Sequence, residues 1–308
     1  CRRAARLCKA DLLTELVDEF PSLQGVVGRE LALEHGENES VAEAIAGHYH
    51  PNAADDPLPE RLESRVLALA DRLDMLVGCF ALGLEPTGSK DPYALRRQAR
   101  AALRLLETSQ LDLPRSGVVE VVRRGYEEQE TEVEEERLDA LQEFLRDRLY
   151  HMALDRGHSH DYIRAVLAAG SDNVADFWAR LQALELCAER EWWPSLVELV
   201  DRTYRIQKNA DDLPDCDPDL LEQEEERKVW NALDQHRNEI QMAFDEANYR
   251  EAAELYCREL SDSVHVFFDE VFVNVDDEAL RDNRKALCRQ IHRLFADNFA
   301  DLYRLEEE

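Results

Sequence analysis

Apolar residues recur at positions i, i+3 or i+4, and i+7 over nearly the whole of this chain, which is the spacing of amphipathic α-helices. Only two runs resemble strands. The run 118–122 is short, and the run 264–273 is rich in β-branched and aromatic residues. Because the apolar positions of 264–273 still follow helical spacing, a helix is predicted there as well. The chain is therefore predicted to be all-α.

The breaks in this periodicity suggest two domains, which suits 308 residues. A loop rich in Pro and Asp spans 50–59, and a turn with two glycines spans 83–90. A third weak zone contains the acidic run 127–136, which is typical of a solvated linker or helix face. We predict an N-terminal helical domain, a helical connection and a C-terminal helical domain, with the bounds 1–107, 108–139 and 140–308. The chain begins as if inside a helix, so we expect a piece of a longer protein.

Several classes of protein are excluded by composition and motifs. No apolar stretch approaches the ~20 residues that a membrane-spanning helix needs. The seven cysteines are an odd number without a Cys-x-x-Cys pair, which argues against a disulfide scaffold or a structural zinc site and favours a reducing cytoplasm. Phosphate-loop, dinucleotide, zinc-peptidase and serine-hydrolase motifs are absent. The pairs His48/His50 and His158/His160 lack metal-ligand spacing. No catalytic residue and no metal site is predicted.

The net charge of −30 argues against a nucleic-acid partner, yet it says nothing about local patches. Asp91 and Pro92 predict the start of a helix over 92–107, as its N-cap and first residue. The face of this helix opposite its apolar side, together with one lysine just upstream, forms a first basic ridge: Lys90, Arg96, Arg97, Arg100 and Arg104.

A second basic ridge lies near the C-terminus. Leu280, Leu287, Ile291 and Leu294 form the apolar stripe of a helix. Basic residues spaced by four cover its other side, with Arg284 at the margin: Arg281, Lys285, Arg289 and Arg293. From the residues alone, two interpretations stay open. These are ordinary solvated faces, or they face an anionic partner.

Several longer motifs carry a resemblance to a known family. They lie at 7–14, 19–28, 68–74, 86–97, 162–168, 175–180, 205–209 and 267–284, with Pro-Thr-Gly-Ser-Lys-Asp-Pro-Tyr-Ala-Leu-Arg-Arg at 86–97 as the most specific. With these motifs the chain resembles the C-terminal part of the β-subunit of bacterial, tetrameric glycyl-tRNA synthetase.

The resemblance implies an HD-type helical domain followed by a DALR-like anticodon-binding helical bundle, whose name motif is Glu-Ala-Leu-Arg at 278–281. Hydrolases of the HD type bind metal through a His, a His-Asp doublet and a distant Asp. Here Cys8 and Lys9 stand near the place of the doublet, and Asp71 alone matches the final Asp. The first domain is therefore expected to be non-hydrolytic.

The resemblance also implies partners. The α-subunit would supply the catalytic domain with ATP and Mg²⁺, in a cytoplasmic α₂β₂ enzyme, while this chain would handle tRNA-Gly without a cofactor of its own. No membrane or DNA partner is expected. The predicted tRNA contacts are Lys90, Arg96, Arg97 and Arg100 on the acceptor side, and Tyr204, Arg205, Lys208, Arg281, Arg284, Lys285, Arg289 and Arg293 on the anticodon side. The alternatives are an HD-type metal-dependent phosphohydrolase and a module that docks the α-subunit.

Overall fold

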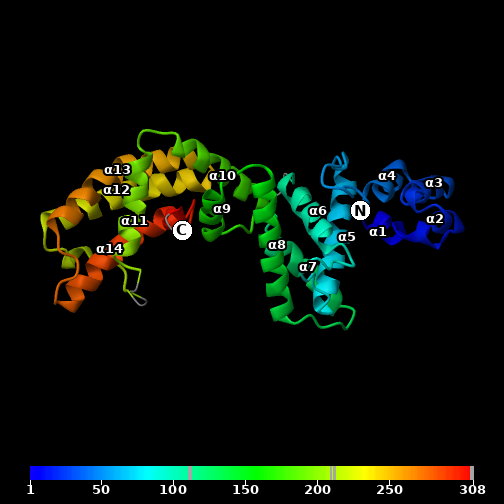
Figure 1. Ribbon diagram of the computed structural model, residues 1–308, viewed down its shortest axis with the longest axis horizontal. Helices are drawn as coiled ribbons and strands as arrows, with labels where there is room; N and C mark the ends of the chain where they lie inside the picture. The colour runs from blue at the N-terminus through cyan, green and yellow to red at the C-terminus, as the bar shows by residue number, and fades with distance from the viewer. Residues whose placement is uncertain (110–112, 209, 211–212, 306–308) are drawn as a thin grey trace. The chain divides into compact units, whose positions relative to one another are not determined.

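The computed structural model describes residues 1–109, 113–208, 210 and 213–305. All the regular secondary structure in these residues is helical, so the predicted all-α class is confirmed (Figure 1). Contacts divide the chain into two units. Unit 1 comprises Cys1–Met152 with Asp172–Ala175, and unit 2 comprises Ala153–Ser171 with Asp176–Glu308. Within the described part of the chain, no helix is both long and apolar enough to cross a membrane.

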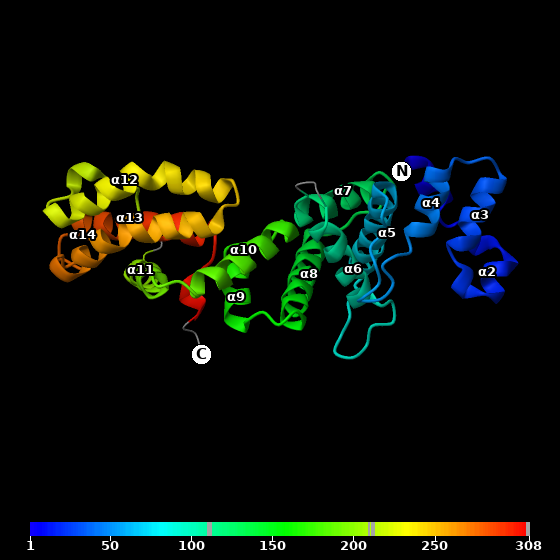
Figure 2. The ribbon, with the colours of Figure 1, turned by 90° about the horizontal axis from the view of Figure 1, so that it is seen from above.

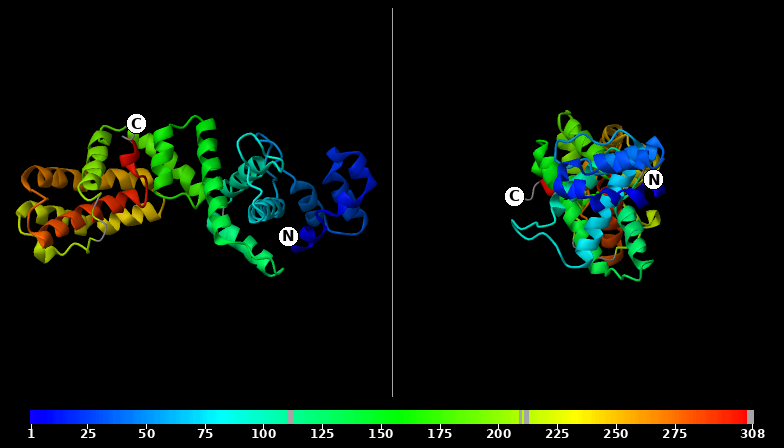
Figure 3. Two further views of the ribbon diagram at one scale, coloured as in Figure 1. Left: turned by 60° about the horizontal axis from the view of Figure 1, so that its bottom comes forward. Right: turned by 90° about the vertical axis from the view of Figure 1, so that its right-hand side faces the viewer.

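Unit 1 begins with a group of short helices, drawn in blue in Figure 3. These are α1 (Arg2–Leu7), α2 (Glu15–Glu19), α3 (Val26–Glu34) and α4 (Glu39–Gly47). Helix α4 packs on α1 and α3 around apolar residues that include Ala4, Ala42 and Ile45. The Asp11 carboxylate is fully buried and accepts a hydrogen bond from the Gly25 backbone N–H at 2.7 Å. This bond satisfies the backbone N–H of Gly25, the residue that precedes α3.

The longer helices of unit 1 are α5 (Leu62–Ala81), α6 (Leu95–Glu107), α7 (Arg115–Glu127) and α8 (Glu135–Asp155). Helix α5 packs against α6 and α7. The predicted apolar face of α6 is buried at Leu95, Ala99, Ala102 and Leu106.

The predicted start of α6 at Pro92 is wrong, because the helix begins three residues later at Leu95. Ala94, the residue before the helix, adopts the left-handed conformation with φ of 54°, so the right-handed helix cannot include it. Asp91 nevertheless caps the helix: its carboxylate accepts from the backbone N–H groups of Leu95 and Arg96 at 2.7 and 3.0 Å. Upstream, Thr87 and Lys90 exchange two backbone hydrogen bonds, which confirms the turn predicted at 87–90.

The segment 108–139 belongs to unit 1 and contains a helix that packs on α5. Helix α7 includes the run 118–122 and buries Val119 at its contact with α5. The Arg115 backbone N–H donates to the Asp172 carbonyl at 2.8 Å, and the Ser116 N–H donates to the Asp172 carboxylate at 2.7 Å. Residues 110–112 of this segment lie outside the described residues.

Unit 2 contains the helices α9 (His160–Ala168), α10 (Val174–Ala188), α11 (Trp193–Arg205), α12 (Glu224–Asp245), α13 (Tyr249–Glu270) and α14 (Glu278–Ala296). Helices α12 and α13 form an antiparallel hairpin, and α14 lies beside it (Figures 1 and 2). The tight connection places Ala247 at φ 58°. Phe244, Tyr249, Phe295 and Phe299 pack in the core, with the rings of Tyr249 and Phe299 stacked 5.5 Å apart.

The run 264–273 is helical as predicted only as far as Glu270. Val271 is extended, with φ −109° and ψ 120°. Val271 and Val273 remain buried although they lie outside the helix. Their apolar side chains therefore continue the core through extended chain, which helical spacing alone cannot distinguish from a last helical turn.

Candidate nucleic-acid interface

The first basic ridge lies on α6 in unit 1. Arg97 is exposed, and Arg96 and Arg100 are half-buried. The Arg96 guanidinium donates to the Gly88 carbonyl at 2.7 Å and lies 3.9 Å from the Asp91 carboxylate. Lys90 is exposed in the turn before the helix. The structure therefore brings Arg96, Arg97 and Arg100 together along one cavity of unit 1, and Lys90 is not among the residues that line it.

Arg104 on the same ridge has an internal role. Its guanidinium donates to the Ala54 carbonyl at 2.7 Å and to the Asp56 carbonyl at 2.8 Å. The Asp56 carboxylate in turn accepts from the backbone N–H groups of Asn52 and Ala53, at 2.8 and 2.9 Å. These bonds hold the loop between α4 and α5 against α6.

The second basic ridge lies on α14 in unit 2, and one of its predicted members is wrong. The Arg284 side chain is only 1% exposed and forms an ion pair with Glu226, which is fully buried. It also donates to the Phe272 carbonyl at 2.9 Å. Arg284 therefore joins α14 to α12 and to the end of α13, and it is not available to an external anion.

Glu226 explains why a charged pair is stable at this buried place. Its other carboxylate oxygen accepts from the backbone N–H groups of Glu222 and Gln223, at 2.7 and 3.1 Å. Glu226 is the third residue of α12, where the helix dipole favours a negative charge. Both carboxylate oxygens are therefore hydrogen-bonded, as a buried ion requires.

Asn283 and Arg289 fix the chain that precedes α12. The buried Asn283 amide accepts from the Asp217 N–H at 2.7 Å and donates to the Asp217 carbonyl at 2.9 Å. The Arg289 guanidinium donates to the carbonyls of Leu213 and Pro214 at 2.5 and 2.8 Å.

The remaining predicted members of this ridge differ in their surroundings. Arg281 pairs with Glu278 and Asp282 at 3.7 and 3.2 Å. Lys285 is half-buried and Arg293 is exposed. Within the described residues, neither of these two side chains has a hydrogen-bond or ion-pair partner. They are the two cations of α14 best placed for an external anion.

The end of α11 and the C-terminal segment bring aromatic and basic side chains together. The half-buried Tyr204 ring lies 4.2 Å from the Tyr303 ring and 5.2 Å from the His292 ring, between centroids. The Lys208 ammonium donates to the Tyr303 hydroxyl at 2.8 Å, and the Arg205 guanidinium lies 6.0 Å from the Tyr303 ring. We call Tyr204, Arg205, Lys208 and Tyr303 the tyrosine cluster.

The sequence singled out three members of the tyrosine cluster but missed Tyr303. Lys208 and Tyr303 are 95 positions apart, and no local spacing links them. His292, which packs on Tyr204, precedes Arg293 of the second ridge. The predicted anticodon-side residues of α11 and the C-terminal end of α14 therefore share one region of unit 2. Aromatic rings with adjacent cations are the usual platform for unstacked nucleobases.

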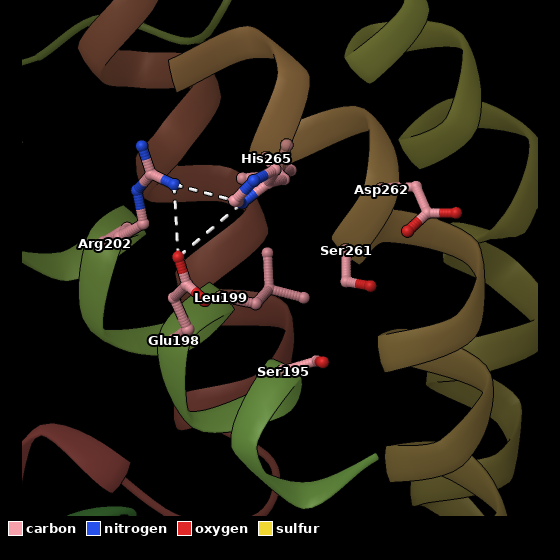
Figure 4. Close-up of a pocket in the computed structure, with 8 residues that line it drawn as sticks. Ser195, Glu198, Leu199, Arg202, Ser261, Asp262 and His265 are labelled. Atoms are coloured by element: carbon pink, nitrogen blue, oxygen red, sulfur yellow. Dashed lines mark hydrogen bonds and ion pairs between the residues drawn. The ribbon is translucent and has the colours of Figure 1, made fainter. Parts of the chain in front are cut away.

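A cavity of about 250 Å³ opens between α11 and α13, and its polar groups largely satisfy one another. Figure 4 shows Arg202, Glu198 and His265 pointing toward one another. The Arg202 guanidinium lies 3.2 Å from the Glu198 carboxylate and 3.3 Å from His265 Nδ1. Since Ser195, Ser261 and the Asp262 carboxylate complete the polar lining, this cavity has no excess of positive charge.

In unit 1 a lysine lies between the two side chains most relevant to metal binding. The Lys9 ammonium is 2.8 Å from Asp71 Oδ1 and 3.1 Å from His48 Nε2, and lies 4.6 Å from the Tyr49 ring centroid. Since an ammonium only donates and the Ile45 carbonyl only accepts, His48 Nε2 accepts from Lys9 and Nδ1–H donates to Ile45 O at 2.6 Å.

This arrangement does not fit a divalent metal. The Lys9 charge already faces both potential ligands, and a second cation would be repelled. Burial, followed by the nearby Lys9 charge, lowers the pKa of His48 to about 4. No group of three or more His, Cys, Asp or Glu suited to a metal ion occurs in the described ranges. The HD assignment itself stays a prediction.

Arg72 is a buried anchor that the sequence did not single out. Its guanidinium donates to the carbonyls of His48, Tyr49 and Pro51 at 2.8 to 2.9 Å. Burial lowers the pKa of Arg72. Together with Arg104, it fixes the loop between α4 and α5.

Two regions of the sequence match models of known protein families. Residues 1–168 match the family model described as glycyl-tRNA synthetase beta subunit, and residues 198–302 match the DALR anticodon binding domain. The second match contains the tyrosine cluster up to Lys208 and all of α14. These matches relate the chain to the aminoacyl-tRNA synthetases and give unit 2 a region similar to an anticodon binding domain.

Because the first match covers more than half of the 308 residues, the chain belongs to the glycyl-tRNA synthetase beta subunit family. This confirms the resemblance found from the motifs. The glycine–tRNA ligase beta subunit of Desulforamulus reducens is 38% identical over 310 residues, covering 100% of this chain and 44% of the relative. Those of Moorella thermoacetica and Ralstonia nicotianae are 36% and 38% identical, covering 98% of this chain and 44% and 43% of the relatives. The chain thus spans less than half the length of these relatives.

Proposed function

We propose that this chain is the non-catalytic, tRNA-handling part of a glycyl-tRNA synthetase β-subunit. It positions tRNA-Gly for ATP-dependent glycylation by the α-subunit. The family membership supports the enzyme, and the DALR match supports anticodon binding. The tyrosine cluster is the observation that carries the proposal to particular residues.

In this proposal the tyrosine cluster receives unstacked bases of the anticodon loop. RNA-binding proteins recognise single-stranded loops by stacking bases on aromatic rings and contacting phosphates with nearby cations. Tyr204 and Tyr303 supply the rings, while Arg205, Lys208 and the exposed Arg293 supply positive charge. On the acceptor side, phosphates are contacted by the four basic residues Lys90, Arg96, Arg97 and Arg100.

The test compares Tyr204→Ala with Tyr204→Phe in the assembled α₂β₂ enzyme. Loss of a stacking ring is expected to raise the Kd for tRNA-Gly by roughly 5- to 150-fold, since one base–aromatic stack contributes about 1–3 kcal/mol. The phenylalanine variant should bind nearly normally. A tRNA with a substituted anticodon should bind equally to wild type and to Tyr204→Ala.

Two outcomes would contradict the proposal. If wild type does not distinguish the two tRNAs, the anticodon role fails. If the alanine variant binds tRNA normally but no longer assembles with the α-subunit, this surface docks the α-subunit instead. Thermal unfolding of both variants controls for loss of the folded unit.

A further inference from the structure

Unit 1 contains a second cavity, whose lining is unusual for so acidic a chain. It has a volume of about 230 Å³ and lies between α6 and α8. Its lining includes Arg96, Arg97 and Arg100 from α6, and Arg148 and His151 from α8. Among the described residues no carboxylate lines it, although the chain has 67 acidic and 37 basic residues.

Two of the arginines that line this cavity have carboxylates beside them. Asp91 lies 3.9 Å from Arg96, and Asp147 pairs with Arg148 and lies 3.5 Å from His151. Arg97 has no such carboxylate partner among the described residues. Guanidinium groups bind phosphate in a forked geometry that an ammonium cannot provide.

Two arginines have donors to spare. The Arg148 Nε–H is buried and has no hydrogen-bond partner among the described residues. Arg97 likewise makes no hydrogen bond or ion pair with a described side chain or carbonyl, and its side chain is exposed at the cavity. Buried polar donors are nearly always satisfied in proteins, so the Arg148 Nε–H points to an acceptor from outside the described residues. Arg97 adds an exposed guanidinium at the same cavity.

The wall of the cavity is held in place without any ligand. Ala54 lines the cavity, and its carbonyl accepts from Arg104 at 2.7 Å. The Arg96 guanidinium is fixed by the Gly88 carbonyl at 2.7 Å. A rigid, preformed wall lowers the entropy that binding an anion would otherwise lose.

We propose that the cavity between α6 and α8 binds a phosphoryl group. Two sources share this chemistry, a phosphodiester of the tRNA backbone and a free polyphosphate or nucleotide. The first source rests on the proposed function. The inference adds Arg148 and His151, which lie on a helix without a basic ridge, to the residues predicted on α6.

The experiment uses the full chain and the variants Arg97→Gln, Arg148→Gln and their double. Arg137→Gln is the matched control: it removes the same charge from α8 in unit 1, but Arg137 pairs with Glu85 at 3.1 Å and does not line the cavity. Affinity for tRNA-Gly is measured at several KCl concentrations, and pyrophosphate binding is measured by calorimetry. Thermal unfolding checks that each variant is folded.

Each lost phosphate contact is expected to reduce the slope of log affinity against log salt by roughly 0.7–0.9. We expect this reduction for Arg97→Gln and Arg148→Gln, and about twice as much for the double variant, beyond any change in Arg137→Gln. Pyrophosphate should compete with tRNA. This result supports the phosphodiester source.

The other outcomes separate the two proposals. If tRNA binds but the cavity variants match Arg137→Gln, the cavity claim is overturned while the proposed function stands. If tRNA does not bind but pyrophosphate binds wild type and not the double variant, the cavity holds a free phosphoryl anion and the proposed function fails. If neither ligand binds, both are overturned.

Discussion

Replacing Arg284 by Met tests whether this arginine is a structural residue. The substitution keeps most of the aliphatic volume and removes the only side-chain cation that faces the buried Glu226 within the described structure. Breaking a buried ion pair by removing one partner costs about 3–5 kcal/mol, because the remaining charge is left without compensation. Glu226 keeps its bonds from the Glu222 and Gln223 backbone, so we expect the lower end of this range.

Tryptophan fluorescence during urea unfolding measures this loss selectively. All four tryptophans lie in unit 2: Trp178, Trp192, Trp193 and Trp230. A loss of about 3 kcal/mol is a large share of the roughly 5–15 kcal/mol by which domains are usually stable. The midpoint of the fluorescence transition should therefore fall clearly.

The control is Arg281→Met, three residues earlier on the same helix. Arg281 is partly exposed, and its partner Glu278 is largely in solvent, so this pair contributes at most about 1 kcal/mol. Adding Glu226→Gln to Arg284→Met should recover part of the loss, since no full charge then remains buried. The structural role of Arg284 is refuted if Arg284→Met unfolds like Arg281→Met and instead weakens tRNA binding.

Three further predictions concern unit 1. Because the pKa of His48 lies at about 4 in the folded chain and near 6.5 in the unfolded chain, the unfolded chain binds the extra proton between these values. Stability should fall as pH drops from about 6.5 to 4, by up to roughly 3 kcal/mol, and His48→Gln should flatten this part of a denaturation-versus-pH curve. Lys9→Met should raise the pKa of His48, measured by NMR titration, because the lysine charge contributes to lowering it; an unchanged pKa would contradict the contact. Arg104→Gln should speed proteolysis in the loop at 53–56, whose carbonyls at Ala54 and Asp56 lose their donor; cleavage at the wild-type rate would show that the loop is held by other means.

The burial of the cysteines determines the reactivity of their thiols. Cys8, Cys187, Cys216, Cys257 and Cys288 are buried free thiols. Burial raises the pKa of Cys187 and of Cys216 to about 12. Since the thiolate is the reactive form, these buried thiols are unreactive at neutral pH.

The sequence by itself determined the fold class and most helices. Helix formation depends on contacts three or four residues apart, so apolar spacing and caps such as Asp91 are visible in the chain itself. The helix boundaries were predicted less accurately than the helices themselves. Helix α6 begins at Leu95 and α13 ends at Glu270, because a left-handed Ala94 and an extended Val271 interrupt patterns that sequence spacing would continue.

Only the tertiary structure decided which charged side chains face solvent. The helical projection places Arg284 at the margin of the basic face of α14, but only the structure shows that it meets Glu226 from 58 positions earlier and is buried. Likewise, Lys208 contacts Tyr303, and Arg148 lines the same cavity as Arg97, although each pair comes from distant segments of the chain. Helical periodicity fixes the face of a helix on which a side chain lies, whereas the packing of other helices fixes whether that face meets a partner, a cavity or water.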